Sequence, residues 1–181
     1  MNNAAFRYGI WISIVLLFTF LGTSLLWVEG SNQHLSVWLG YIGLFVSMIL
    51  LVLGILHKRN KEQGGKITFG QAFRTGATIT LAAGILFFFM NWAFFEIRGD
   101  AWLKKYYAHQ VELIRSGAPS PEAAASRLQQ FEEEWKQSGE RYKNSAFQAG
   151  VVFFTLVPAG FVVSLVGAWL FLGGEPGLMQ L

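Results

Sequence analysis

Four long apolar runs, separated by polar stretches, dominate the hydrophobic pattern of the chain. Each run holds about 20 residues or more, and a helix of that length, rising about 1.5 Å per residue, spans the roughly 30 Å hydrocarbon core of a bilayer. Continuous apolar runs are typical of helices, whereas membrane barrels alternate apolar and polar positions. The pattern therefore predicts four transmembrane helices, at about residues 8–28, 37–56, 72–95 and 147–172.

The fold class that follows is all-α: an integral membrane four-helix bundle in which residues 1–181 form a single membrane domain. A cleaved signal peptide is the competing interpretation of the first run. That run is longer than the apolar stretch of about 7–15 residues found in signal peptides, and no A-x-A-like cleavage site follows it. We expect the first helix to be retained.

One polar segment, residues 97–144, separates the third and fourth runs and carries eight Lys or Arg and seven Asp or Glu residues. Ser120 followed by Pro121 is typical of a helix start within it. We expect an extracytoplasmic hairpin of two helices with apolar stripes at Leu103, Tyr107, Val111 and Ile114, and at Ala124, Leu128, Phe131, Trp135 and Tyr142. The stripes can bury each other beside the membrane, which we favour, or they can dock a partner protein.

The distribution of basic residues predicts the orientation. Residues 57–66 hold four Lys or Arg, residues 29–36 hold none, and Arg7 lies in the N-terminal tail. Because basic residues near membrane helices favour the cytoplasmic side, we expect both termini in the cytoplasm. The eight basic residues of the hairpin argue the other way, but they are spread over a near-neutral unit. We expect five basic side chains to bind lipid headgroups: Lys58, Arg59, Lys61, Lys66 and Arg74.

Small residues recur every four positions on two of the predicted membrane helices. One row is Gly76, Thr80 and Gly84, and the other is Gly160, Ser164 and Ala168; the second helix adds Gly40, Gly43, Ser47 and Gly54. Small side chains let helices approach closely in lipid, where van der Waals packing drives their association. We interpret the rows as helix–helix contacts, in preference to the lining of a pore.

Composition excludes several classes of protein. Hydrophobic residues make up 53% of the chain and charged residues 14%, with a mean hydropathy of +0.40. Because soluble domains carry about 25% charge, this excludes a soluble enzyme, a disordered chain and a nucleic-acid binder. The net charge of +3 is typical of basic residues beside anionic lipid. The absence of cysteine excludes disulfides, a thiol nucleophile and a cysteine-ligated metal.

The start of the third predicted helix carries the motif Gly-Gly-Lys-Ile-Thr-Phe-Gly-Gln-Ala-Phe-Arg-Thr-Gly, at residues 64–76. With this motif the chain resembles the bacterial domain-of-unknown-function family 4199. Further matching pieces are found at residues 92–96, 102–107, 116–117, 142–144 and 158–160. The chain differs in its Gly-Gly-Glu-Pro-Gly stretch near the C-terminus, where such proteins usually carry a basic tail. The resemblance implies a Gram-negative inner-membrane protein with four helices, and it implies no activity.

No catalytic residue, cofactor site or metal site is expected, because the histidines lie in separate polar segments and no nucleophile motif occurs. Arg74 and Glu96 are 22 residues apart, about 33 Å along one helix, and therefore cannot pair. We expect Glu96 to pair with Arg98 or to cap the hairpin. We expect Asn91 to form a hydrogen bond with another helix or with a substrate. We expect Pro158 to kink the fourth helix, either as a static feature or as a hinge.

These observations predict a non-enzymatic membrane anchor or adaptor whose hairpin, residues 97–144, docks a membrane or periplasmic protein. Membrane lipids are the other expected partners, and the chain could also form a homo-oligomer. The alternative is a small oligomeric transporter or channel. We rank it second because the middle of each run lacks the ionisable residue that such proteins use.

Overall fold

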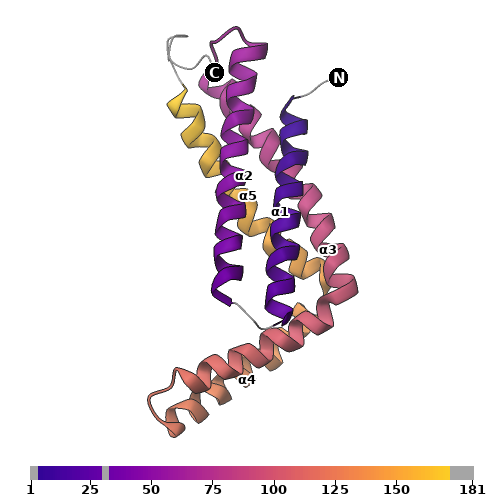
Figure 1. The fold of residues 1–181 in the computed structure, drawn as a ribbon, viewed down its shortest axis with the longest axis vertical. Coiled ribbons are helices and arrows are strands. Elements are labelled where there is room, and N and C mark those ends of the chain that lie inside the picture. Colours follow the sequence, from indigo (N-terminus) through magenta and orange to yellow (C-terminus); the bar gives the residue numbers. More distant parts are fainter. Residues whose placement is uncertain (1–3, 30–32, 172–181) are drawn as a thin grey trace. The chain divides into compact units, whose positions relative to one another are not determined.

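The computed structural model describes residues 4–29 and 33–171, apart from the side chains of residues 25–29, 33–34 and 140. The end of the predicted run 147–172, and the C-terminal stretch after it, lie outside the described residues. The elements are α1 (Ala4–Glu29), α2 (Gln33–His57), the π-helical turn η1 (Lys58–Glu62), α3 (Phe69–Ser116), α4 (Pro121–Tyr142) and α5 (Ser145–Leu170) (Figure 1). Within this described part no strand occurs, which confirms the predicted all-α class.

Among the described residues, four helices are long and apolar enough to cross a membrane, as the hydrophobic pattern predicts. α3 differs from expectation, because it is one helix of 48 residues. The sequence had suggested a membrane helix that ends near residue 95 and a separate polar helix after it. Polarity changes at Glu96, but most of the residues that follow are ordinary helix formers, and the single Gly99 does not end the helix.

The chain divides into two compact units. Unit 1 comprises residues 1–88 and 152–181, and unit 2 comprises residues 89–151. α3 and α5 each contribute residues to both units.

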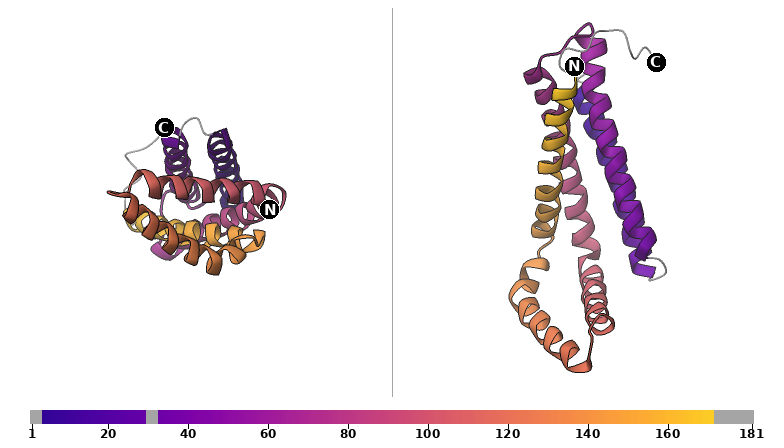
Figure 2. Two further views of the ribbon diagram at one scale, coloured as in Figure 1. Left: turned by 90° about the horizontal axis from the view of Figure 1, so that it is seen from below. Right: turned by 90° about the vertical axis from the view of Figure 1, so that its left-hand side faces the viewer.

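In unit 1 the helices α1, α2, α3 and α5 share one buried apolar cluster, and α1 runs beside α2 (Figure 2). The cluster contains Ala5, Ile12, Leu51, Ile55, Ile67, Ala72, Ile79, Ala83 and Ala168. A polar contact joins two of these helices, since the Ser13 hydroxyl of α1 lies 2.8 Å from the Gly9 carbonyl oxygen and 3.2 Å from that of Ala83 on α3.

The predicted rows of small residues are confirmed as helix–helix contacts. A β-carbon built at Gly76 of α3 would lie 2.7 Å from Ser164 Cβ on α5, and one built at Gly160 would lie 2.5 Å from Thr80 Cγ2. Gly43 of α2 packs equally closely against α1. At these distances no side chain larger than glycine fits without a shift of its neighbours, so the glycines set the helix spacing.

In unit 2 the two predicted apolar stripes meet. The ring of Tyr107 on α3 lies 5.4 Å from that of Phe131 and 5.3 Å from that of Trp135 on α4, measured between centroids. Trp135 also stacks on Tyr106 at 6.2 Å and on Tyr142 at 6.4 Å. Such aromatic pairs add about 0.5–1.5 kcal/mol each beyond the burial of their area, so Trp135 is the centre of the α3–α4 contact.

Local hydrogen bonds fix the starts of two helices. Ser120 is the N-cap of α4, its hydroxyl accepts a hydrogen bond from the Ala123 N–H at 3.2 Å, and Pro121 begins the helix as predicted. At the start of α3, the Thr68 N–H donates to Gln71 Oε1 at 3.1 Å, and the Gln71 N–H donates to Thr68 Oγ1 at 3.3 Å. This reciprocal pair is a capping box, which satisfies two backbone donors.

Candidate functional site

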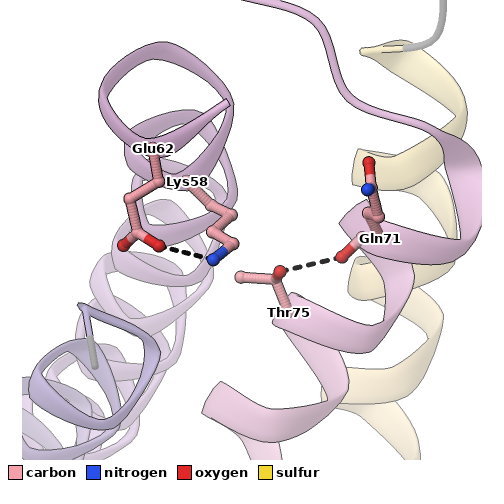
Figure 3. A network of polar contacts seen from close by, with 4 residues as sticks. All are labelled: Lys58, Glu62, Gln71 and Thr75. Atoms are coloured by element: carbon pink, nitrogen blue, oxygen red, sulfur yellow. Dashed lines mark hydrogen bonds and ion pairs between the residues drawn. The ribbon is translucent and has the colours of Figure 1, made fainter. Parts of the chain in front are cut away.

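The basic segment between α2 and α3 is a turn that its own hydrogen bonds hold in place. Arg59 Nε donates to the Gly65 carbonyl oxygen at 2.9 Å, and the Gly65 N–H donates to the Arg59 carbonyl oxygen at 2.9 Å. Gly64 has a φ of 62° and Gly65 a φ of 89°, which favour glycine. Lys58 forms an ion pair with Glu62 in the same turn (Figure 3). Two of the five side chains expected to bind headgroups therefore also have partners within the chain.

The other three residues expected to bind headgroups, Lys61, Lys66 and Arg74, are exposed. Beside them the first turn of α3 is braced internally, because the Thr75 hydroxyl donates to the Gln71 carbonyl oxygen at 2.8 Å (Figure 3). These three side chains are thus accessible, and their contact with lipid stays a prediction.

Two of the three polar or hinge positions from the sequence, Asn91 and Glu96, lie in unit 2 but do not share a face of α3. Asn91 is fully buried in unit 2, whereas Glu96 is exposed there. Five positions apart on one helix, the two side chains point about 140° apart. The expected pair of Glu96 with Arg98 is not formed among the described residues. Pro158 is exposed in unit 1, and α5 continues through it.

A small apolar cavity lies inside unit 1. Its volume is about 60 Å³, and its lining comes from α1, α2, α3 and α5. Thr80 is the notable polar residue there, because its hydroxyl is buried and makes no hydrogen bond to another described residue. No charged side chain lines this cavity, so it offers no group for acid–base chemistry.

A larger groove of about 530 Å³ lies in unit 2, between α3 and α4. Each wall carries a carboxylate four residues before a lysine, Asp100 and Lys104 on α3, and Glu132 and Lys136 on α4. None of these four forms an ion pair with another described residue. The remaining lining consists of Leu103, Tyr107, Trp135 and Lys143. The lining of the groove thus combines apolar and aromatic side chains with charges of both signs.

The sequence revealed only half of this groove. The apolar stripes predicted Leu103, Tyr107 and Trp135 as contact residues, but the acid–lysine pairs beside them were not singled out. Their spacing of four residues, next to an apolar stripe on each helix, was the available signal.

Among the ionisable groups of the described residues, one has a shifted pKa and none is part of a cluster that could hold a metal ion. No group of three His, Cys, Asp or Glu side chains in that part of the chain could hold a metal ion. The pKa of Glu122, in the first turn of α4, lies below its ordinary value of 4.5 because its carboxylate accepts hydrogen bonds from a backbone N–H and from Ser120. This shift belongs to the helix cap and has a structural role.

Comparison with known proteins gives one match. The sequence profile of the family described as a protein of unknown function (DUF4199) matches residues 7–172. No curated protein and no solved structure matches the chain significantly. Since the profile covers most of the chain, the resemblance seen at residues 64–76 is confirmed, and the protein belongs to the DUF4199 family.

Proposed function

We propose that the protein is a non-enzymatic anchor or adaptor of a bacterial inner membrane, in which the four apolar helices form a membrane bundle and residues 97–144 of unit 2 form an extracytoplasmic helical hairpin that docks a partner protein. The observation that carries the proposal is the groove in unit 2, because its lining combines aromatic and apolar side chains with charges of both signs. Membrane insertion, orientation and docking each have separate support.

The surface of unit 1 supports insertion in lipid. Large apolar side chains there are strongly exposed: Phe18 is 71% exposed, Trp38 66%, Phe45 64% and Trp169 70%. Apolar side chains so numerous and so exposed are unfavourable in water and favourable against acyl chains. In unit 2 the exposed face of α4 is instead rich in charged and amide side chains, which suits water.

The ends of unit 1 support a cytoplasmic location for both termini. The ring of Tyr8, near the start of α1, lies 5.8 Å from that of His57, at the end of α2. Phe171, just after α5, packs against the buried cluster that contains Ile55 and Ile67. The N-terminal end, the basic turn and the end of α5 are thus neighbours, as expected for an even number of membrane crossings with the basic side in the cytoplasm.

The residues that line the groove support a partner of a particular chemistry. The lining contains Trp135 and Tyr107, and Trp and Tyr are among the side chains enriched at the positions that dominate binding energy at interfaces. The pairs Asp100–Lys104 and Glu132–Lys136 offer both signs of charge on both walls. A matching partner is a helix with one apolar edge flanked by acidic and basic residues, laid into the groove.

Site-specific photocrosslinking in the native bacterium tests the docking. A photoreactive amino acid at Lys104 on one wall and, separately, at Lys136 on the other should yield the same crosslinked protein. The same amino acid at Arg127, which is exposed on α4 outside the groove, should not yield it.

The charge of the opposite wall provides the matched control. With the photoreactive group at position 104, Lys136→Glu should reduce the crosslink severalfold, because it places a third carboxylate beside Glu132 and Asp100. Arg127→Glu makes the same change of charge on another face and should leave the yield unchanged. Docking in the groove would be refuted if Lys136→Glu and Arg127→Glu reduced the crosslink yield equally. It would also be refuted if the photoreactive groups at positions 104 and 136 captured different proteins.

A small oligomeric transporter or channel is the second candidate, and the cavity that contains Thr80 is the observation that favours it. Purified protein reconstituted in vesicles would be assayed for saturable flux of protons, Na⁺ and K⁺. Ala159→Leu fills the cavity, whereas Ala77→Leu changes a half-buried site on α3 outside it. Flux abolished only by Ala159→Leu would replace the adaptor proposal, and no flux in the unaltered protein would argue against transport of these ions.

A further inference from the structure

A pocket of about 310 Å³ lies between the start of α1 and the end of α2 in unit 1. This volume is at the lower end of the range of about 300–1,000 Å³ that is typical of small-molecule sites. The lining includes Arg7, Tyr8, Trp11, Leu50, Leu53 and His57, and it contains no carboxylate. The pocket adjoins the basic turn, but it shares none of the residues that the sequence marked for headgroup binding.

One part of the pocket carries the positive charge of Arg7. Arg7 of α1 and His57 of α2 line it from two helices, and neither forms an ion pair with another described residue. The ring of Tyr8 lies 5.8 Å from that of His57 and packs against it. In contrast, Lys58, the next residue along, is paired with Glu62. Arg7 is therefore the available permanent charge, and a guanidinium matches the geometry of a phosphate.

The other part of the pocket is apolar and open. Trp11 is 57% exposed, Leu53 is 43% exposed, and Leu50 is half-buried. Tryptophan is enriched at the level of lipid headgroups, where its ring is apolar and its N–H is polar. A ligand that satisfies both parts is an amphiphile with an anionic head and a hydrocarbon chain.

We propose that this pocket is a binding site for one anionic phospholipid. Arg7 binds the lipid phosphate beside His57, and the first part of an acyl chain lies on Trp11 and Leu53. This is a defined site, in contrast to the general attraction of lipid to a basic turn. The inference uses the membrane placement proposed above, and it does not require that unit 2 docks a partner.

The first test uses the full chain in detergent micelles with added dioleoyl phosphatidylglycerol or dioleoyl phosphatidylcholine, and native mass spectrometry counts the bound lipids. One phosphatidylglycerol should be retained with about fivefold preference, the effect of one arginine beside an anionic headgroup. Arg7→Gln should abolish the preference and Arg7→Lys should restore part of it. Arg74→Gln, which removes an exposed arginine outside the pocket, should preserve it. If Arg7→Gln and Arg74→Gln reduced the preference for phosphatidylglycerol equally, the lipid would be held by general electrostatic attraction and the proposal would be overturned.

The second test separates a lipid from a free phosphate. Leu53 and Ile49 are one turn apart on α2 and each is 43% exposed, but only Leu53 lines the pocket. Leu53→Ala should weaken retention of phosphatidylglycerol, and Ile49→Ala should not. Inorganic phosphate at millimolar concentration should fail to displace the lipid. If inorganic phosphate displaced phosphatidylglycerol, and if Leu53→Ala retained the lipid as well as the unaltered protein does, the pocket would bind an anion without contacting an acyl chain. That result would refute the lipid assignment.

Discussion

At the residue scale, Gly160 shows how the helices of unit 1 come together. A β-carbon at this position would lie 2.5 Å from Thr80 Cγ2, 2.8 Å from Thr80 Oγ1 and 3.2 Å from Thr80 Cβ. Rotation about χ1 moves the first two atoms, but the Thr80 β-carbon is fixed to the α3 backbone. Relief therefore requires a movement of one helix against the other. Since α5 also contains Gly150, where nothing lies within 4 Å of such a β-carbon, the chain offers its own control.

We expect Gly160→Ala to lower the free energy of unfolding by about 1–3 kcal/mol, the usual cost of overpacking. Gly150→Ala should leave it unchanged or raise it by up to about 1 kcal/mol, because alanine is the better helix former. Unfolding by SDS in mixed micelles, followed by far-ultraviolet circular dichroism, measures both variants. Equal stabilities would mean that α3 and α5 are not in tight contact at this point.

At the element scale, the helix starts were more predictable than the extent of α3. Ser120 and Pro121 predicted the start of α4 correctly, because a cap is a local hydrogen-bonding arrangement of a few adjacent residues. The change at Glu96 from apolar to polar residues predicted a helix end that the structure does not have. Polarity reports which solvent a side chain prefers, whereas a helix ends where the backbone loses its favourable conformation. The interval from Glu96 to Ser116 contains no proline to impose such an end.

The start of α4 should depend on pH through Glu122. Its pKa in the folded chain lies below its ordinary value of 4.5, so the stabilisation is complete above about that pH and is lost as the pH falls through the folded pKa. Amide hydrogen exchange in the first turn of α4, after correction for the intrinsic exchange rates, should be faster at a pH where Glu122 is protonated than it is at neutral pH. Glu122→Gln should remove this dependence, while Glu134→Gln, at an exposed position later in α4, should retain it. A pH dependence that persists in Glu122→Gln would assign the effect to another group.

At the scale of the whole molecule, composition and periodicity predicted the class of protein but not its surfaces. The apolar runs and the stripes through Leu103 and Trp135 depend on neighbours along one helix, and the sequence contains that information directly. The groove and the pocket at Arg7 depend on which side chains two different helices bring together. From the sequence, Arg7 is only a charge that orients the chain, because nothing local to it indicates that it lines a pocket together with His57.

The orientation itself gives a prediction for the intact cell. The chain contains no cysteine, so a single introduced thiol reports one position without background. Asn60 in the basic turn and Gln130 on α4 are both exposed. If the basic turn is cytoplasmic, an impermeant maleimide should label Gln130→Cys in cells whose outer membrane has been permeabilised, and it should label Asn60→Cys only after the inner membrane is also opened. The reverse labelling pattern would mean that the orientation in the membrane is the opposite of the predicted one and that the docking groove lies in the cytoplasm. If the maleimide labelled both cysteines before the inner membrane is opened, positions 60 and 130 would lie on the same side of that membrane, which would contradict the proposed topology.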